Sequence, residues 1–249
     1  MRFWTKVKQY PRLGMVLLAF IAFVALGLPD GLLGVGWPSI RAGFSLPLDA
    51  LGLLLTSVVV GYMTSSFMSG TLVSRIGIGR VLAGSCFITG CALIGYTLVP
   101  QWWMMVLLGV FAGLGAGAID AGLNTYVASN FGEGIMQWLH AFWGVGITIG
   151  PLIMTFGLTS FNTWRFGYRV VGVFQILLAV GFMLTLRMWT QNPPPSPSGA
   201  AEAEKRADKR TEKQTEKRLT DYKTPMRETL RRPQVWLSVA LFFLYVGAE

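Results

Sequence analysis

The sequence predicts an all-α polytopic membrane protein. Of its 249 residues, 53% are hydrophobic and only 13% are charged, with a mean hydropathy of +0.52. A soluble domain carries charge at about twice that rate. Residues 50–74 and 81–119 contain no Asp, Glu, Lys or Arg. Each run exceeds the roughly 20 residues that a helix needs to cross a bilayer, whereas a β-barrel would show alternating segments of about ten residues.

Seven apolar segments follow from the breaks at charges, prolines and polar clusters. They run approximately over 13–36, 50–73, 80–99, 102–128, 137–160, 169–190 and 234–249. The first segment is too long for the apolar region of a signal peptide, and no small-residue cleavage site ends it. We therefore group residues 1–190 as an N-terminal bundle of six transmembrane helices.

The segment after this bundle changes character abruptly. Residues 191–232 open with "QNPPPSPSG" and carry eleven basic and seven acidic residues with few apolar ones. This composition predicts a charged cytoplasmic linker that is solvated. Binding of its net positive charge to a lipid surface is the alternative.

Residues 233–249 predict the start of a seventh transmembrane helix that is truncated after about 16 apolar residues. This segment resembles the first one, because Glu249 follows Arg232 by 17 residues much as Asp30 follows Arg12 by 18. A parallel repeat of two halves would leave such a pattern. We expect a second six-helix half that is missing from this chain.

The distribution of Lys and Arg predicts the orientation. With the N-terminus in the cytoplasm, eighteen basic residues lie on the cytoplasmic side and three, Arg41, Arg165 and Arg169, lie outside. Cytoplasmic loops carry such an excess, so we expect a multi-pass protein of the cytoplasmic membrane. The net charge of +9 is then a topology signal and not the footprint of a nucleic-acid partner.

The loop between the second and third segments carries a recognisable motif. It reads "GTLVSRIGIGR", in which Gly70, Arg75, Gly77 and Arg80 have the spacing of a motif of the major facilitator superfamily, while Ser74 stands in place of its acid. Together with the long charged linker, the chain resembles the N-terminal half of a member of that superfamily over its whole length. The glycines suit a tight turn, and the basic residues favour the cytoplasm.

Two further stretches resemble one group within that superfamily. "GLGAGAIDAGLNTYVASNF" and "LHAFWGVGITIGP" are similar to bacterial sugar–proton symporters of the fucose/glucose permease group. The resemblance implies proton-coupled transport of a small hydroxylated solute, with sugar as the favoured substrate. Proton-coupled efflux of lipophilic compounds, a non-transporting half-length membrane protein, and Na+ in place of the proton are the alternatives.

Asp120 is the leading candidate for proton coupling. A carboxylate within the bilayer costs about 2.5–3.5 kcal/mol, so it faces protein or water. Gly109, Gly113 and Gly117 form a small-residue ridge for helix packing. At 100° per residue, Asp120 lies about 20° from Gly113, with Asn124 one turn later. We expect Asp120 and Asn124 to line a polar cavity and bind proton and substrate; a structural acid is the alternative.

Asp30 is the second candidate for proton coupling. It follows Pro29 amid several glycines, and helices interrupted in this way often line substrate paths. Trp37 lies seven residues further on and suits stacking on a sugar ring. The alternatives are a structural acid at the outer boundary for Asp30 and an interfacial anchor for Trp37.

The remaining candidates bind substrate. His140, the single His of the chain, can relay protons or bind hydroxyl groups, although a solvated residue at a helix end is the alternative. Trp143 suits an aromatic platform, and Glu249 is included because its segment resembles that of Asp30. With one His and two Cys, no catalytic set, metal site or cofactor motif is predicted.

Overall fold

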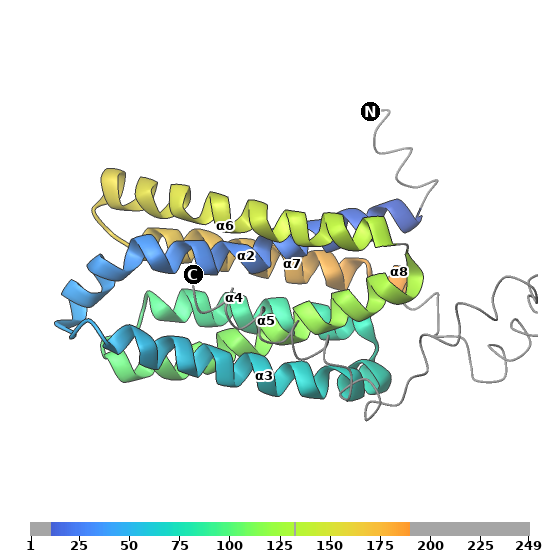
Figure 1. Cartoon of the computed structure of the whole chain (residues 1–249), viewed down its shortest axis with the longest axis horizontal. Helices are drawn as coiled ribbons and strands as arrows, with labels where there is room; N and C mark the ends of the chain where they lie inside the picture. The colour runs from blue at the N-terminus through green and yellow to red at the C-terminus, as the bar shows by residue number, and fades with distance from the viewer. Residues whose placement is uncertain (1–10, 132, 190–249) are drawn as a thin grey trace, which may run out of the picture. The chain divides into compact units, whose positions relative to one another are not determined.

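The computed structural model describes residues 11–131 and 133–189, all of whose regular elements are α-helices. In Figure 1 the long helices lie side by side along one common axis, and successive helices run in opposite directions. These helices are α2 (Pro11–Phe44), α3 (Ala50–Ile76), α4 (Ile78–Tyr96), α5 (Trp102–Asn130), α6 (Glu133–Phe161) and α7 (Arg165–Leu184), and the short α8 is Leu186–Trp189. All six long helices are apolar enough to cross a membrane. The expected all-α polytopic class is confirmed, while residues 191–249, including Glu249, lie outside the described residues.

Two helices differ in extent from the apolar runs of the sequence. Helix α2 continues to Phe44 and includes Pro38, where we expected an end near residue 36. Helix α7 begins at Arg165 and ends at Leu184, so it starts and stops earlier than the apolar run of 169–190. In both cases the helix includes polar or proline residues that the apolar pattern excluded, because its length is set by packing against neighbours as well as by hydropathy.

The predicted loop of residues 70–80 is a single residue. Helix α3 continues to Ile76 and α4 begins at Ile78, so only Gly77 separates them. Gly77 has φ +84°, a conformation that favours glycine, and its N–H donates to the carbonyl of Val73 at 2.9 Å. Gly70 lies within α3 and makes no turn. The tight turn expected from the motif therefore depends on Gly77, with Arg75 and Arg80 on either side.

Helices α3 and α5 pack through small residues. A Cβ atom at Gly113 of α5 would overlap the carbonyl oxygen of Val58, and one at Gly117 would overlap that of Tyr62. From the other side, a Cβ atom at Gly61 of α3 would overlap the carbonyl oxygen of Val110. The ridge predicted from the sequence is therefore a packing surface, along which two helix backbones meet.

Close backbone contact at glycines also joins other pairs of helices. A Cβ atom at Gly27 of α2 would overlap the carbonyl oxygen of Trp143 in α6, and Gly146 of α6 meets the backbone of α2 in return. Helices α4 and α7 approach each other where Gly90 faces Gly172. The bundle thus contains closely packed helix pairs whose backbones meet at these glycines, beside two clusters of buried side chains.

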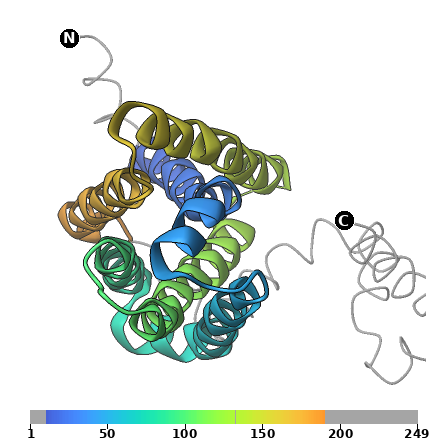
Figure 2. The ribbon, with the colours of Figure 1, turned by 90° about the vertical axis from the view of Figure 1, so that its left-hand side faces the viewer.

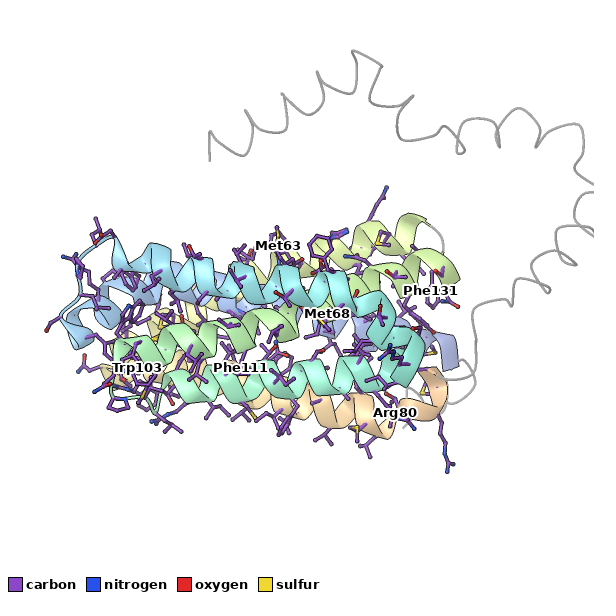
Figure 3. The ribbon with its side chains drawn as sticks, turned by 90° about the horizontal axis from the view of Figure 1, so that it is seen from below. Met63, Met68, Arg80, Trp103, Phe111 and Phe131 are labelled. Atoms are coloured by element: carbon purple, nitrogen blue, oxygen red, sulfur yellow. The ribbon has the colours of Figure 1, made fainter. Side chains whose placement is uncertain are left out.

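The outer surface of the bundle is apolar. Large exposed side chains include Phe67 at 86% and Leu184 at 82% relative exposure. Figure 3 labels four others on α3 and α5: Met63, Met68, Trp103 and Phe111. Soluble monomers rarely expose apolar patches on this scale. This surface suits the hydrocarbon interior of a bilayer.

Two of the basic residues that oppose the orientation rule are both bonded to one residue. Arg165 donates through Nε to the carbonyl oxygen of Thr97 at 3.2 Å, and Arg169 donates through Nε to the Thr97 hydroxyl at 3.2 Å. Thr97 follows the last residue of α4, where the helix dipole favours positive charge. Both arginines therefore have a local hydrogen-bonding role at the end of α4.

Pro29 removes one backbone donor from α2 without breaking the helix. Proline has no N–H, so the carbonyl of Ala25, four residues earlier, loses its usual partner. The side chain of Gln175 in α7 supplies the replacement, because its Nε2 donates to the Ala25 oxygen at 2.9 Å. Gln175 is fully buried. The expected interruption of the helix is therefore limited to one hydrogen bond, which an amide of another helix replaces.

The role of the glycines gives a first prediction. Gly61→Ala places a methyl group against the Val110 backbone, and we expect the free energy of unfolding to fall by roughly 1–3 kcal/mol. Gly70→Ala on the same helix meets open space and should stabilise by up to about 1 kcal/mol through helix propensity. Unfolding in mixed detergent micelles measures both. Equal effects of the two substitutions would contradict the packing role.

The Ala25 carbonyl gives a second prediction. Gln175→Leu leaves this buried oxygen without a donor and should destabilise the bundle by about 1–3 kcal/mol. In a Pro29→Ala background the restored N–H of residue 29 bonds to Ala25, so the cost of Gln175→Leu should fall below about 1 kcal/mol. The same cost in both backgrounds would show that Gln175 does not replace the missing donor.

Candidate functional site

All six long helices line one cavity of about 430 Å³, a size within the range of ligand pockets. Figure 2 shows the bundle from one end, with the helices grouped side by side. The lining residues are mainly apolar and aromatic, with a small number of polar groups among them. They are Phe23, Leu26, Pro29, Asp30, Leu33, Leu54, Leu55, Val58, Tyr62, Thr89, Leu93, Tyr96, Ala112, Ala116, Asp120, His140, Trp143, Tyr168 and Gln175.

Two carboxyl groups share this cavity without a basic partner. Asp30 comes from α2 and Asp120 from α5, and no Lys or Arg is among the residues that line the cavity. A charge held away from bulk water is costly unless it is paired or hydrogen-bonded. Because the lining offers no cation, these carboxyl groups depend on hydrogen-bond donors, on a proton, or on a cation that enters the cavity.

Asp120 receives two hydrogen bonds, one to each carboxylate oxygen. The hydroxyl of Tyr62, from α3, donates to Oδ2 at 2.5 Å. The side-chain amide of Asn124, one turn further along α5, donates through Nδ2 to Oδ1 at 3.0 Å. The close contact of α3 with Gly117 brings the Tyr62 backbone near enough for its ring to reach the acid. This arrangement fits an ionised carboxylate, since both oxygens act as acceptors.

Asp30 lies one residue after Pro29 and is more exposed than Asp120, with its side chain on the cavity lining. The side chain of Trp143, from α6, lies near its carboxyl group. Trp143 is 39% exposed, so part of its ring is open to a ligand. Asp30 and Trp143 therefore combine a carboxyl group with an aromatic surface on one side of the cavity.

His140 also reaches the cavity lining. It is the eighth residue of α6, and its ring meets Phe23 of α2 edge-on, with ring centres 5.7 Å apart. The structure therefore brings together four of the residues predicted from the sequence: Asp120, Asp30, His140 and Trp143. Among the described residues no three His, Cys, Asp or Glu side chains cluster as ligands of a metal ion.

The other predicted substrate residues have different places. Asn124 is not part of the cavity lining but holds Asp120. Trp37 is 6% exposed and packs beside Trp102, with ring centres 5.8 Å apart, away from the cavity. Glu249 lies outside the described residues. Residue spacing placed Trp37 near the face of Asp30, but α2 continues past Pro38 and packs this ring into the core.

Five polar lining residues were missed in the sequence: Tyr62, Thr89, Tyr96, Tyr168 and Gln175. Tyr62 donates a hydrogen bond to Asp120, and Gln175 donates one to the Ala25 carbonyl oxygen. Thr89 is buried, with 3% of its surface exposed. The Thr89 hydroxyl and the Gln175 Oε1 have no hydrogen-bond partner among the described residues. Gln175 is the one amide in the apolar run "GVFQILLAV", which was a usable signal. Tyr62 carries no such signal, because its role depends on a contact with another helix.

Several transporters are similar to this chain. It is 24% identical over 180 residues to the glucose/mannose transporter GlcP of Bacillus subtilis (strain 168), an alignment that covers 70% of this chain and 43% of that protein. It is 23% identical over 163 residues to the 3-(3-hydroxy-phenyl)propionate transporter of Escherichia coli (strain K12), covering 65% and 40%. Over 111 residues it is 29% identical to the efflux pump DEP3 of Fusarium langsethiae, covering 43% and 20%.

The chain thus spans less than half the length of these relatives. The family model described as Major Facilitator Superfamily matches residues 16–248, almost the whole chain. This match agrees with the six apolar helices and with the resemblance noted in the sequence. The chain is a multi-pass membrane protein that belongs to the Major Facilitator Superfamily of transporters.

Proposed function

We propose that the protein takes part in secondary active transport of a small hydroxylated solute, with sugar favoured, together with a proton. The observation that carries this proposal is that Asp120 and Asp30 line one cavity whose lining contains no Lys or Arg. An ionised carboxylate in such a cavity disfavours an occluded state, because the lining offers it no Lys or Arg as a permanent partner. Protonation removes this cost, so loading of the proton and closure of the cavity are linked.

The lining of the cavity supports a hydroxylated ligand. Aromatic rings of Trp143, Tyr96 and Tyr168 offer apolar faces, while Thr89 and His140 offer hydrogen-bonding groups. This mixture is typical of sites that orient a ligand by a few polar contacts. The similarity to a protein named as a glucose/mannose transporter also favours a sugar over other hydroxylated solutes.

The transport cycle is alternating access around this cavity. We place the N-terminus in the cytoplasm, with the membrane the cytoplasmic one, because the Lys and Arg of the sequence favour that side. The relatives are more than twice as long as their aligned stretches. The proposed cycle therefore includes a second half, with residues 191–232 as the linker and Glu249 near the start of that half.

The role of Asp120 gives a third prediction, to be measured with the complete gene product in membrane vesicles. Glucose or mannose should raise the external pH as it enters with protons. Asp120→Asn should remove most of this proton-coupled uptake, yet spare exchange of labelled sugar between the two sides. Exchange survives because it needs no net release of the proton.

Asp49→Asn is the matched control, because Asp49 precedes α3 and is not part of the cavity lining. It should retain the proton signal. Proton-coupled uptake that is unchanged in Asp120→Asn would contradict the coupling role. Proton release driven by lipophilic compounds would instead indicate efflux. Sugar uptake that requires Na+ would indicate that Na+, and not the proton, is the coupling ion.

Asp30 gives a fourth prediction in the same vesicles. We expect Asp30→Asn to lower proton-coupled uptake as well, but less than Asp120→Asn does, because Asp30 is the more exposed of the two acids. Sugar exchange should again survive. Wild-type proton coupling in Asp30→Asn would leave Asp120 as the single coupling acid.

A further inference from the structure

Two pairs, each of a carboxyl group and an aromatic residue, have matching positions in the bundle. Gly117 lies three residues before Asp120, and a Cβ atom there would overlap the carbonyl oxygen of Tyr62. Gly27 lies three residues before Asp30, and a Cβ atom there would overlap the carbonyl oxygen of Trp143. Tyr62 on α3 therefore has the same position relative to Asp120 as Trp143 on α6 has relative to Asp30.

Each aromatic residue also offers a donor to its acid. The Tyr62 hydroxyl donates to Asp120 Oδ2 at 2.5 Å, and the Trp143 side chain lies near the Asp30 carboxyl group, with its indole N–H as the possible donor. All four residues line the same cavity. The two pairs thus share a backbone contact, a spacing and a type of interaction, which is the relation expected of inverted repeats within a six-helix half.

The two aromatic residues differ in what protonation of the acid allows. An indole N–H can only donate, whereas a phenol O–H can donate or accept. Asp120 Oδ1 accepts from the Asn124 amide at 3.0 Å, and that amide nitrogen cannot accept in return. While the Asn124 amide keeps this orientation, a proton that arrives at Asp120 is placed on Oδ2, where the Tyr62 oxygen is available as its acceptor.

We propose that Tyr62 transmits the protonation state of Asp120 to a hydroxylated ligand in the cavity. When Asp120 is ionised, the Tyr62 O–H donates to Oδ2. When Asp120 is protonated, the Oδ2–H donates to the Tyr62 oxygen, and the Tyr62 O–H turns to donate to an oxygen of the ligand. No covalent bond of Tyr62 breaks, and the transported proton stays on Asp120. This inference rests on the proposed function.

Four other ionisable side chains line the cavity and contribute to the electrostatic environment of Tyr62 and Asp120. They come from the remaining helices around the cavity and include no Lys or Arg: Asp30 from α2, Tyr96 from α4, His140 from α6 and Tyr168 from α7. Tyr62 is within electrostatic range of Asp30 as well as of Asp120. The side-chain hydrogen bonds to the Asp120 carboxyl group come from Tyr62 and Asn124, so these two residues decide where its proton is held.

The test is the affinity of the complete gene product for D-glucose as a function of pH. In the wild type, affinity should be higher where Asp120 is protonated, by roughly 2- to 10-fold for one added hydrogen bond. Tyr62→Phe should remove this dependence and keep the lower affinity throughout. Asp120→Asn should give the higher affinity at every pH, because the Asn amide donates to the Tyr62 oxygen as the protonated acid does.

The double variant Asp120→Asn with Tyr62→Phe should have the lower affinity at every pH. Tyr126→Phe is the matched control, since it removes a hydroxyl from α5 that bonds to the Met15 sulfur, outside the cavity lining. It should keep the wild-type pH dependence. Wild-type pH dependence in Tyr62→Phe would overturn the proposed transmission, while unchanged proton-coupled uptake in Asp120→Asn would overturn the proposed function instead.

A measurement without ligand covers the case in which glucose does not bind. The infrared band of the protonated carboxyl group, assigned by its loss in Asp120→Asn, should move to higher frequency in Tyr62→Phe, because the acid loses its acceptor. It should not move in Tyr126→Phe. A band that stays in place in Tyr62→Phe would show that the Tyr62 oxygen does not accept this proton, and the inference would be wrong.

Discussion

Backbone contact between paired helices is the constraint on which the rest of this structure depends. Lipid tails are as apolar as the surfaces of the helices, so helices in a bilayer associate by close packing and interhelical hydrogen bonds. Here Gly27, Gly61 and Gly117 let neighbouring backbones meet. Because Gly27 and Gly117 each precede an acid by three residues, the register that packs the helices also places each acid beside an aromatic donor on the partner helix.

The charges of the cavity follow from the same packing. Two carboxyl groups lie on one lining without Lys or Arg, and the hydrogen bonds to Asp120 come from the neutral side chains of Tyr62 and Asn124. Neutral donors stabilise the ionised carboxylate by hydrogen bonds and still allow it to be protonated. A Lys or Arg would instead stabilise the ionised form as a permanent ion pair. Elsewhere the bundle uses a buried amide for a purely structural purpose, where Gln175 replaces the N–H that Pro29 lacks. Polar groups within the bundle therefore serve both stability and chemistry.

The sequence predicts the class, the six helices and the two acids, because charge-free runs of this length are typical of membrane-spanning helices and an acid within one is costly unless it has a role. It also predicts the packing role of Gly113 and Gly117, which follows from helical spacing. It does not predict the partners across helices. Tyr62 becomes recognisable only when α3 lies on α5, and Trp37 shares a face with Asp30 by spacing yet packs beside Trp102. Which residues meet depends on the crossing of two helices, and periodicity along one helix contains no such information.

The central claim is that binding of solute and protonation of Asp120 are linked. Its most direct test is the number of protons that the purified complete gene product takes up from a weakly buffered solution on binding D-glucose. Linkage requires uptake wherever the bound state holds more protons than the free state. For the 2- to 10-fold linkage inferred above, we predict a maximum uptake of about 0.2–0.5 proton per glucose in the wild type and a clearly smaller uptake in Asp120→Asn. Equal uptake in both proteins, or glucose binding without proton uptake at any pH, would contradict this claim.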